Sequence, residues 1–461
     1  MKFGNLVIAG LVTGSIYAVF AVCVAVWYRV SNILNLAVGD FAMAGALGVD
    51  DLYRVRGLPL PAAIAYTLAV IAVFAYAYDQ IVLRLAQDGA RRAEGIVITF
   101  FFTFALSFFI DGVAKTLFGT DVHAAPALWN GQSLAWAGLH LERAGLLVLA
   151  CAVVIGGMFW LYIRYTLGGK ALEACGENPV GARIAGIDTR RYRRLIFVGT
   201  AVIAALFGIV ESPITGYTYL SGATISLTGF LAAAYGGFRK PGRALAAGLF
   251  IGVLEALLGG YVSTEYGDTI MYALLAALVL AWPRPRLRVG GERMSGPRSR
   301  LLPALGRWRG LGPTGLVVVV GVVITALYGA QYTGSVFVLA ACYAIVTAGM
   351  AVQIGFSQQI AFSQSVFMGA GAYGVAMLNS RLGWPVLAAT PVVLVASGIA
   401  ALLLGSVVTR ASGLALAVAT LMMPLIAVGY VTSAGYLGGA VGAPLTGTTP
   451  TGESSATRST T

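Results

Sequence analysis

The chain has 461 residues, of which 58% are hydrophobic and 10% are charged, with a formal net charge of +12. Soluble domains carry about 25% charged residues, so this composition excludes an ordinary soluble enzyme and indicates a protein that folds in lipid. Four scattered cysteines and only two histidines argue against a disulfide framework or metal chemistry, and because the positive charge flanks apolar runs we expect no nucleic-acid partner.

Long apolar runs follow one another along the chain. Gly145–Tyr162 and Gly315–Leu327 approach the roughly 20 residues that cross a bilayer, and they do not alternate as barrel strands would. The fold predicted is therefore all-α, a polytopic transmembrane helical bundle. The first run continues to Tyr28 without a small-residue cleavage pattern, which predicts a retained span and not a signal peptide.

A polar interruption follows this first run, in Ser31–Leu47. It holds four candidate residues for a pathway through the membrane, namely Asn35, Gly39, Asp40 and Phe41. One interpretation is a broken helix facing the pathway, because backbone freed by a break is tolerated only where protein or water can satisfy it. The other is a turn at headgroup level, in which Asn35 and Asp40 cap the next helix.

Positive charge gathers in two segments further along. Arg164–Arg194 has seven basic residues against three acidic ones, and Arg284–Arg309 has eight against one. Basic residues that flank spans stay in the cytoplasm, so both segments are predicted there, and the loop Thr120–Glu142 with His123 and His140 outside. Two cytoplasmic segments must be separated by an even number of crossings. Four apolar runs lie between them, at 195–212, 215–237, 244–262 and 269–282. The second of these runs also fits a re-entrant segment.

Four acidic residues lie in or near apolar runs. Glu211 and Glu255 are candidates for a function inside the membrane, although an interfacial position explains Glu211 equally well. Asp79 and Asp111 are expected near helix ends.

The second half repeats the opening pattern at an offset of 326 residues, because Phe41–Leu47 reappears as Phe367–Tyr373. Each copy follows an apolar run and a short polar interruption. The second interruption adds the pathway candidates Gln358, Gln359, Ser363 and Gln364. Membrane carriers are often built from repeats that meet at a midplane pathway lined by broken helices.

Several motifs occur in a recognisable order over the first 280 or so residues. These motifs resemble successive parts of one family. Its opening helix is matched by Gly10–Ala18 and its polar break by Asn35–Phe41. Its coupling segment is matched by Gly168–Ala174 with Asn178–Ile187, and its closing Arg-Pro end by Pro283–Pro285. That family is the inner-membrane permeases of branched-chain amino-acid ABC transporters. The sequence departs from it at Leu83-Arg84-Leu85, which lacks a usual proline, and at Glu173, where arginine is common.

The second half, from Gly355 to Gly442, resembles the partner permease of the same family and then stops before that partner's remaining spans. The resemblance implies two related permease halves fused head to tail, with the second truncated. The predicted organisation is a first permease domain (1–287), a basic cytoplasmic linker (288–313), a partial second permease domain (314–445) and a polar tail (446–461).

The resemblance implies a multi-pass permease subunit of an ATP-binding-cassette importer in a bacterial inner membrane, moving branched-chain or related amino acids by alternating access. The chain would bind no cofactor and would not be an enzyme, because ATP is used by a separate subunit. Gly168-Gly169-Lys170-Ala171 lacks the residues that complete a phosphate loop. The implied partners are cytoplasmic ATP-binding subunits, a periplasmic solute-binding protein, membrane lipid and, if the second half cannot act alone, another permease chain. The competing hypotheses are an ion-coupled secondary transporter and an inactive truncated permease.

A short amphipathic helix is predicted within Gly168–Gly186 and ends at Gly186, because glycine readily takes positive φ. Small apolar residues beside charges suit docking into a groove on a soluble partner, whereas the alternative is a surface connector with no partner. The residues assigned to this coupling segment are Gly168, Lys170, Glu173, Ala174, Glu177, Asn178, Pro179, Ala182 and Gly186.

Overall fold

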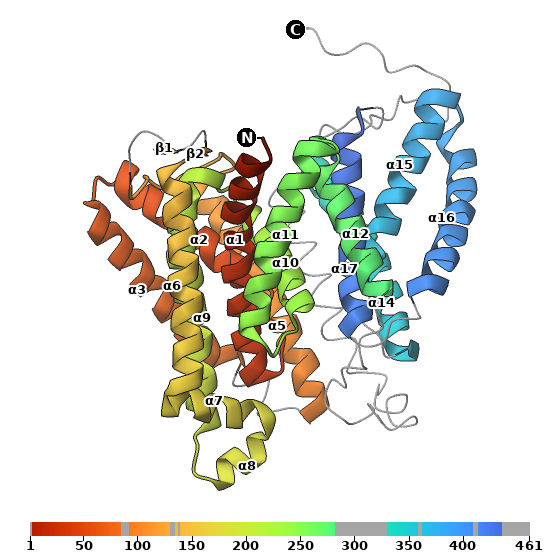
Figure 1. The fold of residues 1–461 in the computed structure, drawn as a ribbon. Helices are drawn as coiled ribbons and strands as arrows, with labels where there is room; N and C mark the ends of the chain where they lie inside the picture. Colours follow the sequence, from red (N-terminus) through yellow and green to blue (C-terminus); the bar gives the residue numbers. More distant parts are fainter. Residues whose placement is uncertain are drawn as a thin grey trace. The chain divides into compact units, whose positions relative to one another are not determined.

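The computed structural model describes residues 2–83, 92–129, 134–136, 139–281, 330–357, 362–408 and 414–435. The chain divides into two compact units, Met1–Gly267 and Asp268–Thr461 (Figure 1). Six helices of the described part are long and apolar enough to cross a membrane, and this confirms the predicted all-α polytopic bundle. The predicted linker and polar tail lie outside the described residues.

The first unit is built from helices of very unequal length. They are α1 (Lys2–Ser31), α2 (Val38–Asp50), η1 (Asp51–Val55), α3 (Leu60–Tyr78), η2 (Asp79–Leu83), α5 (Arg92–Phe118), α6 (Arg143–Tyr165), α7 (Leu167–Glu177), α8 (Pro179–Ile184), α9 (Thr189–Thr215), α10 (Ser221–Gly236) and α11 (Pro241–Tyr261). Two short antiparallel strands, β1 (Leu134–Trp136) and β2 (Leu139–Leu141), lie in the connection between α5 and α6.

Helix α1 lies inside the first unit and packs against α6, α9, α10 and α11. Its apolar residues surround the helix instead of forming one stripe, and a helix of that kind is expected to be buried on all sides. Glycines bring α1 and α11 together, because a Cβ added at Gly252 would lie 2.1 Å from the amide nitrogen of Gly14. Close backbone approach through small residues is a main source of helix association in lipid.

Large apolar side chains on the outer helices remain exposed. Val73 of α3, Val154 and Met158 of α6 and Phe250 of α11 are at least half exposed. In water such a surface would cause association, but hydrocarbon is as apolar as these side chains. These surfaces suit contact with lipid or with another apolar helix.

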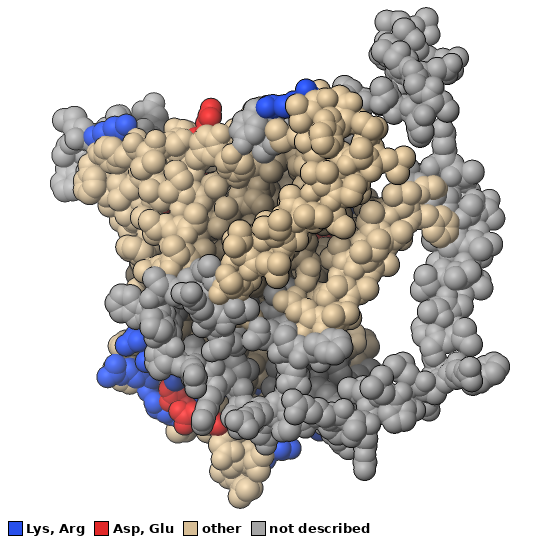
Figure 2. Space-filling view, turned by 90° about the vertical axis from the view of Figure 1, so that its right-hand side faces the viewer, with Lys and Arg blue, Asp and Glu red and all other residues tan. Residues whose placement is uncertain are grey.

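Charge is distributed unevenly between the two ends of the first unit. Figure 1 places α7 and α8 at one end and the N-terminus with β1 and β2 at the other, and Figure 2 shows basic side chains gathered at the lower end with a few acidic ones among them. Described basic residues at the α7–α8 end are Arg29, Arg164, Lys170, Arg183, Arg190, Arg191, Arg193, Arg194, Arg239, Lys240 and Arg243, and acidic ones are Asp79, Glu173, Glu177 and Asp188. By the positive-inside rule, the α7–α8 end is predicted to face the cytoplasm.

The second unit contains α12 (Gly267–Ala281), α14 (Ala330–Ser357), α15 (Gln364–Leu382), α16 (Val386–Val408) and α17 (Leu414–Ser433). The repeated motif begins equivalent helices in both units, since Phe41–Leu47 lies in α2 and Phe367–Tyr373 lies in α15. At the start of α15, Gln364 Nε2 donates to Gln353 Oε1 of α14 at 2.8 Å. The Phe362 amide, two residues earlier, donates to the Thr420 hydroxyl of α17 at 3.1 Å.

Candidate functional site

The predicted break after α1 is present, and its backbone groups are satisfied by protein. Leu34, in the non-helical segment between α1 and α2, accepts a hydrogen bond through its carbonyl from the Thr103 hydroxyl of α5 at 3.2 Å. The Ala37 amide donates to Asn35 Oδ1 at 3.0 Å, and the Gly39 amide donates to Ser226 Oγ of α10 at 2.8 Å. A break inside a bundle is stable only when it is satisfied in this way.

The first turn of α2 packs directly against the first turns of α10. A Cβ at Gly39 would lie 2.3 Å from the Gly222 carbonyl oxygen, and one at Gly222 would lie 2.2 Å from Asp40 Oδ1. We call Gly39, Asp40, Gly222 and Ser226 the α2–α10 junction. With 13 and 16 residues, α2 and α10 are both shorter than the roughly 20 residues of a full crossing, and α10 covers the run that also fitted a re-entrant segment.

Asp40 is fully buried at this junction, and neither carboxylate oxygen has a hydrogen-bond partner by distance and angle among the described residues. Ser107 and Asp111 of α5 are the polar side chains that interact with it. The amino-terminal ends of two helices meet here, and helix N-termini carry partial positive charge that favours a carboxylate. This is a physical reason for an acidic residue in so apolar a chain.

The other residues of the first interruption are equally buried. Asn35 is 2% exposed, and the Phe41 ring lies edge-on to Phe197 and Phe74 with ring centroids 6.1 and 6.5 Å away. Burial inside the bundle does not fix the depth of these residues in the membrane, and Asn35 makes a local capping bond that a turn at headgroup level also expects, so both interpretations stay predictions. The part of these residues in a transport pathway stays a prediction.

The second set of predicted pathway residues is only partly visible. Gln358 and Gln359 lie outside the described residues. Ser363 directly precedes α15 and makes no side-chain capping bond, whereas Gln364 begins that helix. The structure does not bring the two sets together within one unit, because they belong to different units.

The structure corrects the expectation for Asp111 and describes the surroundings of Glu211 and Asp79. Asp111 lies about two turns inside α5 beside Asp40, not near a helix end, because α5 continues to Phe118. Glu211 is fully buried on α9, one turn before the helix ends at Thr215, and its carboxylate accepts a hydrogen bond from the Tyr217 hydroxyl. Burial among helices does not set its depth in the membrane, so both interpretations of Glu211 stay predictions. Asp79 directly follows α3, as expected, and pairs with Arg194 at 3.1 Å.

The coupling segment is two helices and not the single helix predicted. Asn178 is extended and its Oδ1 accepts from the Gly181 amide at 3.0 Å, so it caps α8, whose first residue is Pro179. Proline has no amide to continue α7 and fits the first position of a new helix. Gly186 has φ of +81° just after α8, as predicted, and Asp188 caps α9 through the Arg190 and Arg191 amides.

Helix α7 is attached to the point where α1 ends. Glu173 forms ion pairs with Arg29 of α1 and, at 3.1 Å, with Lys170. Asn32, whose φ is +57°, donates to the Gly176 carbonyl at 3.3 Å and accepts from Arg239 at 2.6 Å. The acidic residue at 173 is therefore used to hold the coupling segment to α1.

From the sequence, Asn32 was placed in the polar interruption, but its contacts with α7 and Arg239 were not predicted, and no role was assigned to Arg29 or Arg239. The only local signal was an asparagine directly after a long apolar run, because asparagine tolerates positive φ better than most residues. Its partners lie 144 and 207 residues away along the chain, so no local pattern announces them.

The α7–α8 segment has a buried face and an exposed apolar tip. Leu172, Cys175, Gly176 and Ala182 are buried, Gly168, Glu173, Ala174 and Pro179 are intermediate, and Lys170, Glu177, Asn178 and Gly186 are exposed. On α8, Val180 is 42% exposed and Ile184 is 82% exposed. In the described part of the chain, these two apolar side chains at the tip are left largely uncovered.

At the opposite end, the loop after α5 is tied to the bundle. His123 Nδ1 lies 3.0 Å from Asp50 Oδ2, and its Nε2 lies 3.0 Å from the Phe118 carbonyl oxygen. The backbone of His123 pairs with Tyr217 beyond the end of α9. Within the described ranges, no group of three or more His, Cys, Asp or Glu residues could hold a metal ion.

Comparison with known proteins identifies the family. The family described as "Branched-chain amino acid transport system / permease component" matches residues 6–279 and 332–460. The chain belongs to this permease family. Both matched segments carry the same description, in agreement with the internal repeat, and the predicted family is confirmed. As a family member with apolar spanning helices, the permease is a multi-pass protein of the inner membrane.

The permease is similar to several curated proteins. It is 28% identical over 295 residues to the high-affinity branched-chain amino acid transport system permease protein LivH of Escherichia coli K12, which covers 59% of this chain and 92% of LivH. It is 24% identical over 294 residues to the permease protein BraD of Pseudomonas aeruginosa, with the same coverage. A shorter stretch of 86 residues is 35% identical to the galactofuranose transporter permease protein YtfT of Escherichia coli, covering 18% of this chain and 24% of YtfT. No solved structure matches the chain.

Proposed function

We propose that this permease moves branched-chain or related amino acids into the cell and is driven by a separate cytoplasmic ATP-binding subunit. The names of the similar proteins LivH and BraD support this substrate class. In this proposal the chain binds no cofactor and catalyses no reaction, and a periplasmic solute-binding protein delivers the cargo. The proposed pathway is bordered by residues of both polar interruptions, namely Asn35, Gly39, Asp40 and Phe41 of the first and Gln358, Gln359, Ser363 and Gln364 of the second.

The observation that carries the proposal is the attachment of α7 to the break after α1. Glu173 and Gly176 of α7 are bonded to Arg29 and Asn32, and the chain reaches the α2–α10 junction seven residues after Asn32. A displacement of α7 by a motor subunit would therefore be passed to α2. Alternating access needs a rigid connection of this kind between the driven element and the broken helices.

The exposed tip of α8 is the proposed contact with the motor subunit. Ile184 and Val180 are uncovered apolar side chains next to Arg183, and a soluble groove can bury a short helix through such anchors. Fully burying one isoleucine is worth about 1.5–3 kcal/mol, which is roughly tenfold to a hundredfold in affinity.

The test is Ile184→Asp with Val55→Asp as its matched control. Both residues are β-branched and highly exposed, but Val55 lies in η1 beyond α2, away from α8. Tagged permease is purified from membranes that contain all subunits, and the ATP-binding subunit that co-purifies is quantified. We expect Ile184→Asp to lower its recovery at least about tenfold and Val55→Asp to leave it unchanged. Equal recovery with both variants would contradict docking through α8.

A second candidate is ion-coupled transport, and the buried pair Asp40 and Asp111 favours it. Ionisable residues inside a membrane often carry protons or ions. Uptake into inverted and right-side-out vesicles separates the two mechanisms. Import that stops when ATP is removed, but survives a proton ionophore, supports the ATP-driven proposal, and the reverse pattern supports ion coupling.

A further inference from the structure

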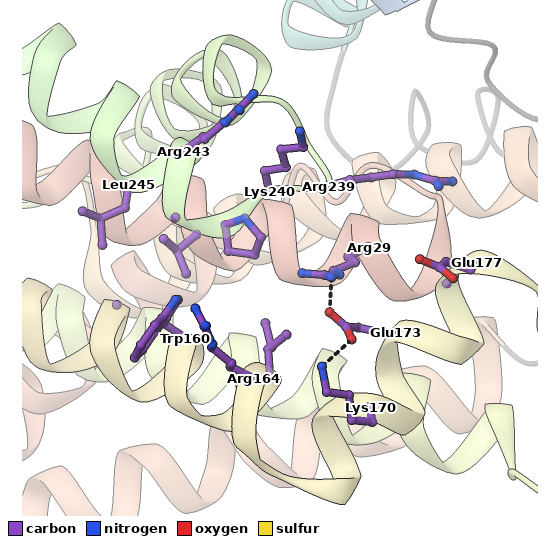
Figure 3. Close-up of a pocket in the computed structure, with 16 residues that line it drawn as sticks. Arg29, Trp160, Arg164, Lys170, Glu173, Glu177, Arg239, Lys240, Arg243 and Leu245 are labelled. Atoms are coloured by element: carbon purple, nitrogen blue, oxygen red, sulfur yellow. Dashed lines mark hydrogen bonds and ion pairs between the residues drawn. The ribbon is translucent and has the colours of Figure 1, made fainter.

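A pocket of about 600 Å³ opens at the α7–α8 end of the first unit (Figure 3). It lies between the ends of α1 and α6, helix α7, and the start of α11. Its basic lining residues are Arg29, Arg164, Lys170, Arg239, Lys240 and Arg243. Only Glu173 and Glu177 among its lining residues are acidic, so the pocket carries an excess of positive charge.

Four of these basic side chains already have partners. Arg29 and Lys170 pair with Glu173, and Arg239 donates to Asn32. The Arg164 guanidinium lies over the Trp160 ring, 5.3 Å from its centroid.

Lys240 and Arg243 are different. Both are exposed, and neither side chain makes a hydrogen bond or ion pair with another described residue. Figure 3 shows them on the side of the pocket formed by the start of α11, across from Trp160 and Arg164. Two free cations on one wall of a concave site suit a phosphate group, which accepts charge-assisted hydrogen bonds from both.

The deeper part of the pocket is apolar. Val22 of α1, Gly156 of α6 and Leu245 of α11 line it, and Val22 is 1% exposed. The ligand that fits such a pocket has an anionic head and an apolar chain.

Trp160 sets the depth of the pocket in the bilayer. It is 50% exposed near the end of α6, and the neighbouring Tyr165 is 67% exposed. Tryptophan and tyrosine on the outside of a membrane bundle concentrate at the headgroup level. The pocket therefore lies where phospholipid headgroups meet their acyl chains.

We propose that this pocket binds an anionic phospholipid, with its phosphate at Lys240 and Arg243 and one acyl chain against Leu245 and Trp160. Basic pockets between helices on the cytoplasmic side recognise anionic headgroups in this manner. Free phosphate and nucleotides offer the same charge but have no chain for the apolar floor. Because Lys170 and Glu173 form one wall, a bound lipid also supports α7 against α1.

The test measures which lipid the full-length permease retains in detergent. Native mass spectrometry compares phosphatidylglycerol and phosphatidylcholine bound from an equimolar mixture. The variant Lys240→Gln with Arg243→Gln removes the two free cations, and Arg190→Gln with Arg191→Gln removes two cations of the same end that do not line the pocket. At about 1 kcal/mol for each basic residue, the first variant should lose about 30-fold in preference for phosphatidylglycerol, and the control should keep it.

Three results would overturn the proposal. One is an unchanged preference in the Lys240 and Arg243 variant. Another is displacement of phosphatidylglycerol by glycerol 3-phosphate or ATP, because that would identify a site for a free anion. The third is loss of the co-purifying ATP-binding subunit without loss of lipid, which would assign the pocket to the partner protein.

A second measurement leaves Lys240 and Arg243 unchanged, so its result does not depend on whether their double variant folds. Brominated phosphatidylglycerol should quench the fluorescence of Trp160 more strongly than brominated phosphatidylcholine at the same mole fraction. The Trp160→Phe variant supplies the signal of the other tryptophans, which is subtracted. Equal quenching by the two lipids would refute a preference for the anionic headgroup.

Discussion

Replacing Gly39 with alanine tests whether the α2–α10 junction is as tightly packed as the structure describes. The new Cβ would lie 2.3 Å from the Gly222 carbonyl oxygen and 2.6 Å from the Ser226 amide nitrogen. Both obstacles are backbone atoms of α10, so no side-chain rotation can relieve the contact. Ordinary contacts begin near 3.4 Å, so α2 and α10 must separate by about 1 Å.

The expected loss of stability follows from two contributions. Overpacking a well-packed interior typically costs about 1–3 kcal/mol, and backbone obstacles favour the upper part of that range. Separation also weakens the 2.8 Å hydrogen bond from the Gly39 amide to Ser226 Oγ, worth about 1 kcal/mol. A total near 3 kcal/mol corresponds to a fall in Tm of roughly 6–12 °C for a unit of this size.

Thermal unfolding of the purified permease in detergent measures this loss, with Gly199→Ala as control. Gly199 is a helical glycine on α9 with nothing within 4 Å of an added Cβ, so its variant should keep the wild-type Tm. Ser226→Ala removes the hydrogen bond without adding volume, so its Tm should lie between those of Gly39→Ala and Gly199→Ala. We also expect Gly39→Ala to abolish amino-acid uptake. If Gly39→Ala and Gly199→Ala unfold at the same temperature, the close approach of α2 and α10 is wrong.

Three further outcomes are expected from other parts of the first unit. Gly252→Ala should lower Tm by several degrees, because its Cβ would meet the α1 backbone at 2.1 Å. The control is Gly259→Ala on the same helix, whose Cβ meets nothing within 4 Å. Identical Tm values for these two variants would contradict the α1–α11 contact. A membrane-impermeant maleimide should label Ala185→Cys only in inside-out vesicles and Val122→Cys only in right-side-out ones, and the opposite pattern would invert the topology. Native Cys175 should react slowly at pH 7 and faster as the pH rises, because burial raises the pKa of its thiol and the thiolate is the reactive form.

Local sequence signals were sufficient for the class of protein and the position of the break. Lipid imposes these signals residue by residue, because a span needs about 20 apolar residues and every polar interruption stands out against them. The interruption at Asn35–Asp40, the end of α8 at Gly186 and the basic character of the α7–α8 end were all visible in this way. The division of the coupling segment at Asn178–Pro179 was missed, although proline, which favours the first position of a new helix, was a local signal for it.

Only the tertiary structure decided what these elements contact. Gly39 meets Ser226 across 187 residues of chain, Arg29 meets Glu173 across 144, and Asp40 lies beside Asp111 of a different helix. Such pairs depend on which small residues let two backbones approach and on which helices become neighbours. Neither property has a period or a motif in the sequence. The chain's local chemistry therefore determined that a polar break follows the first apolar helix, and helix packing determined which groups satisfy it.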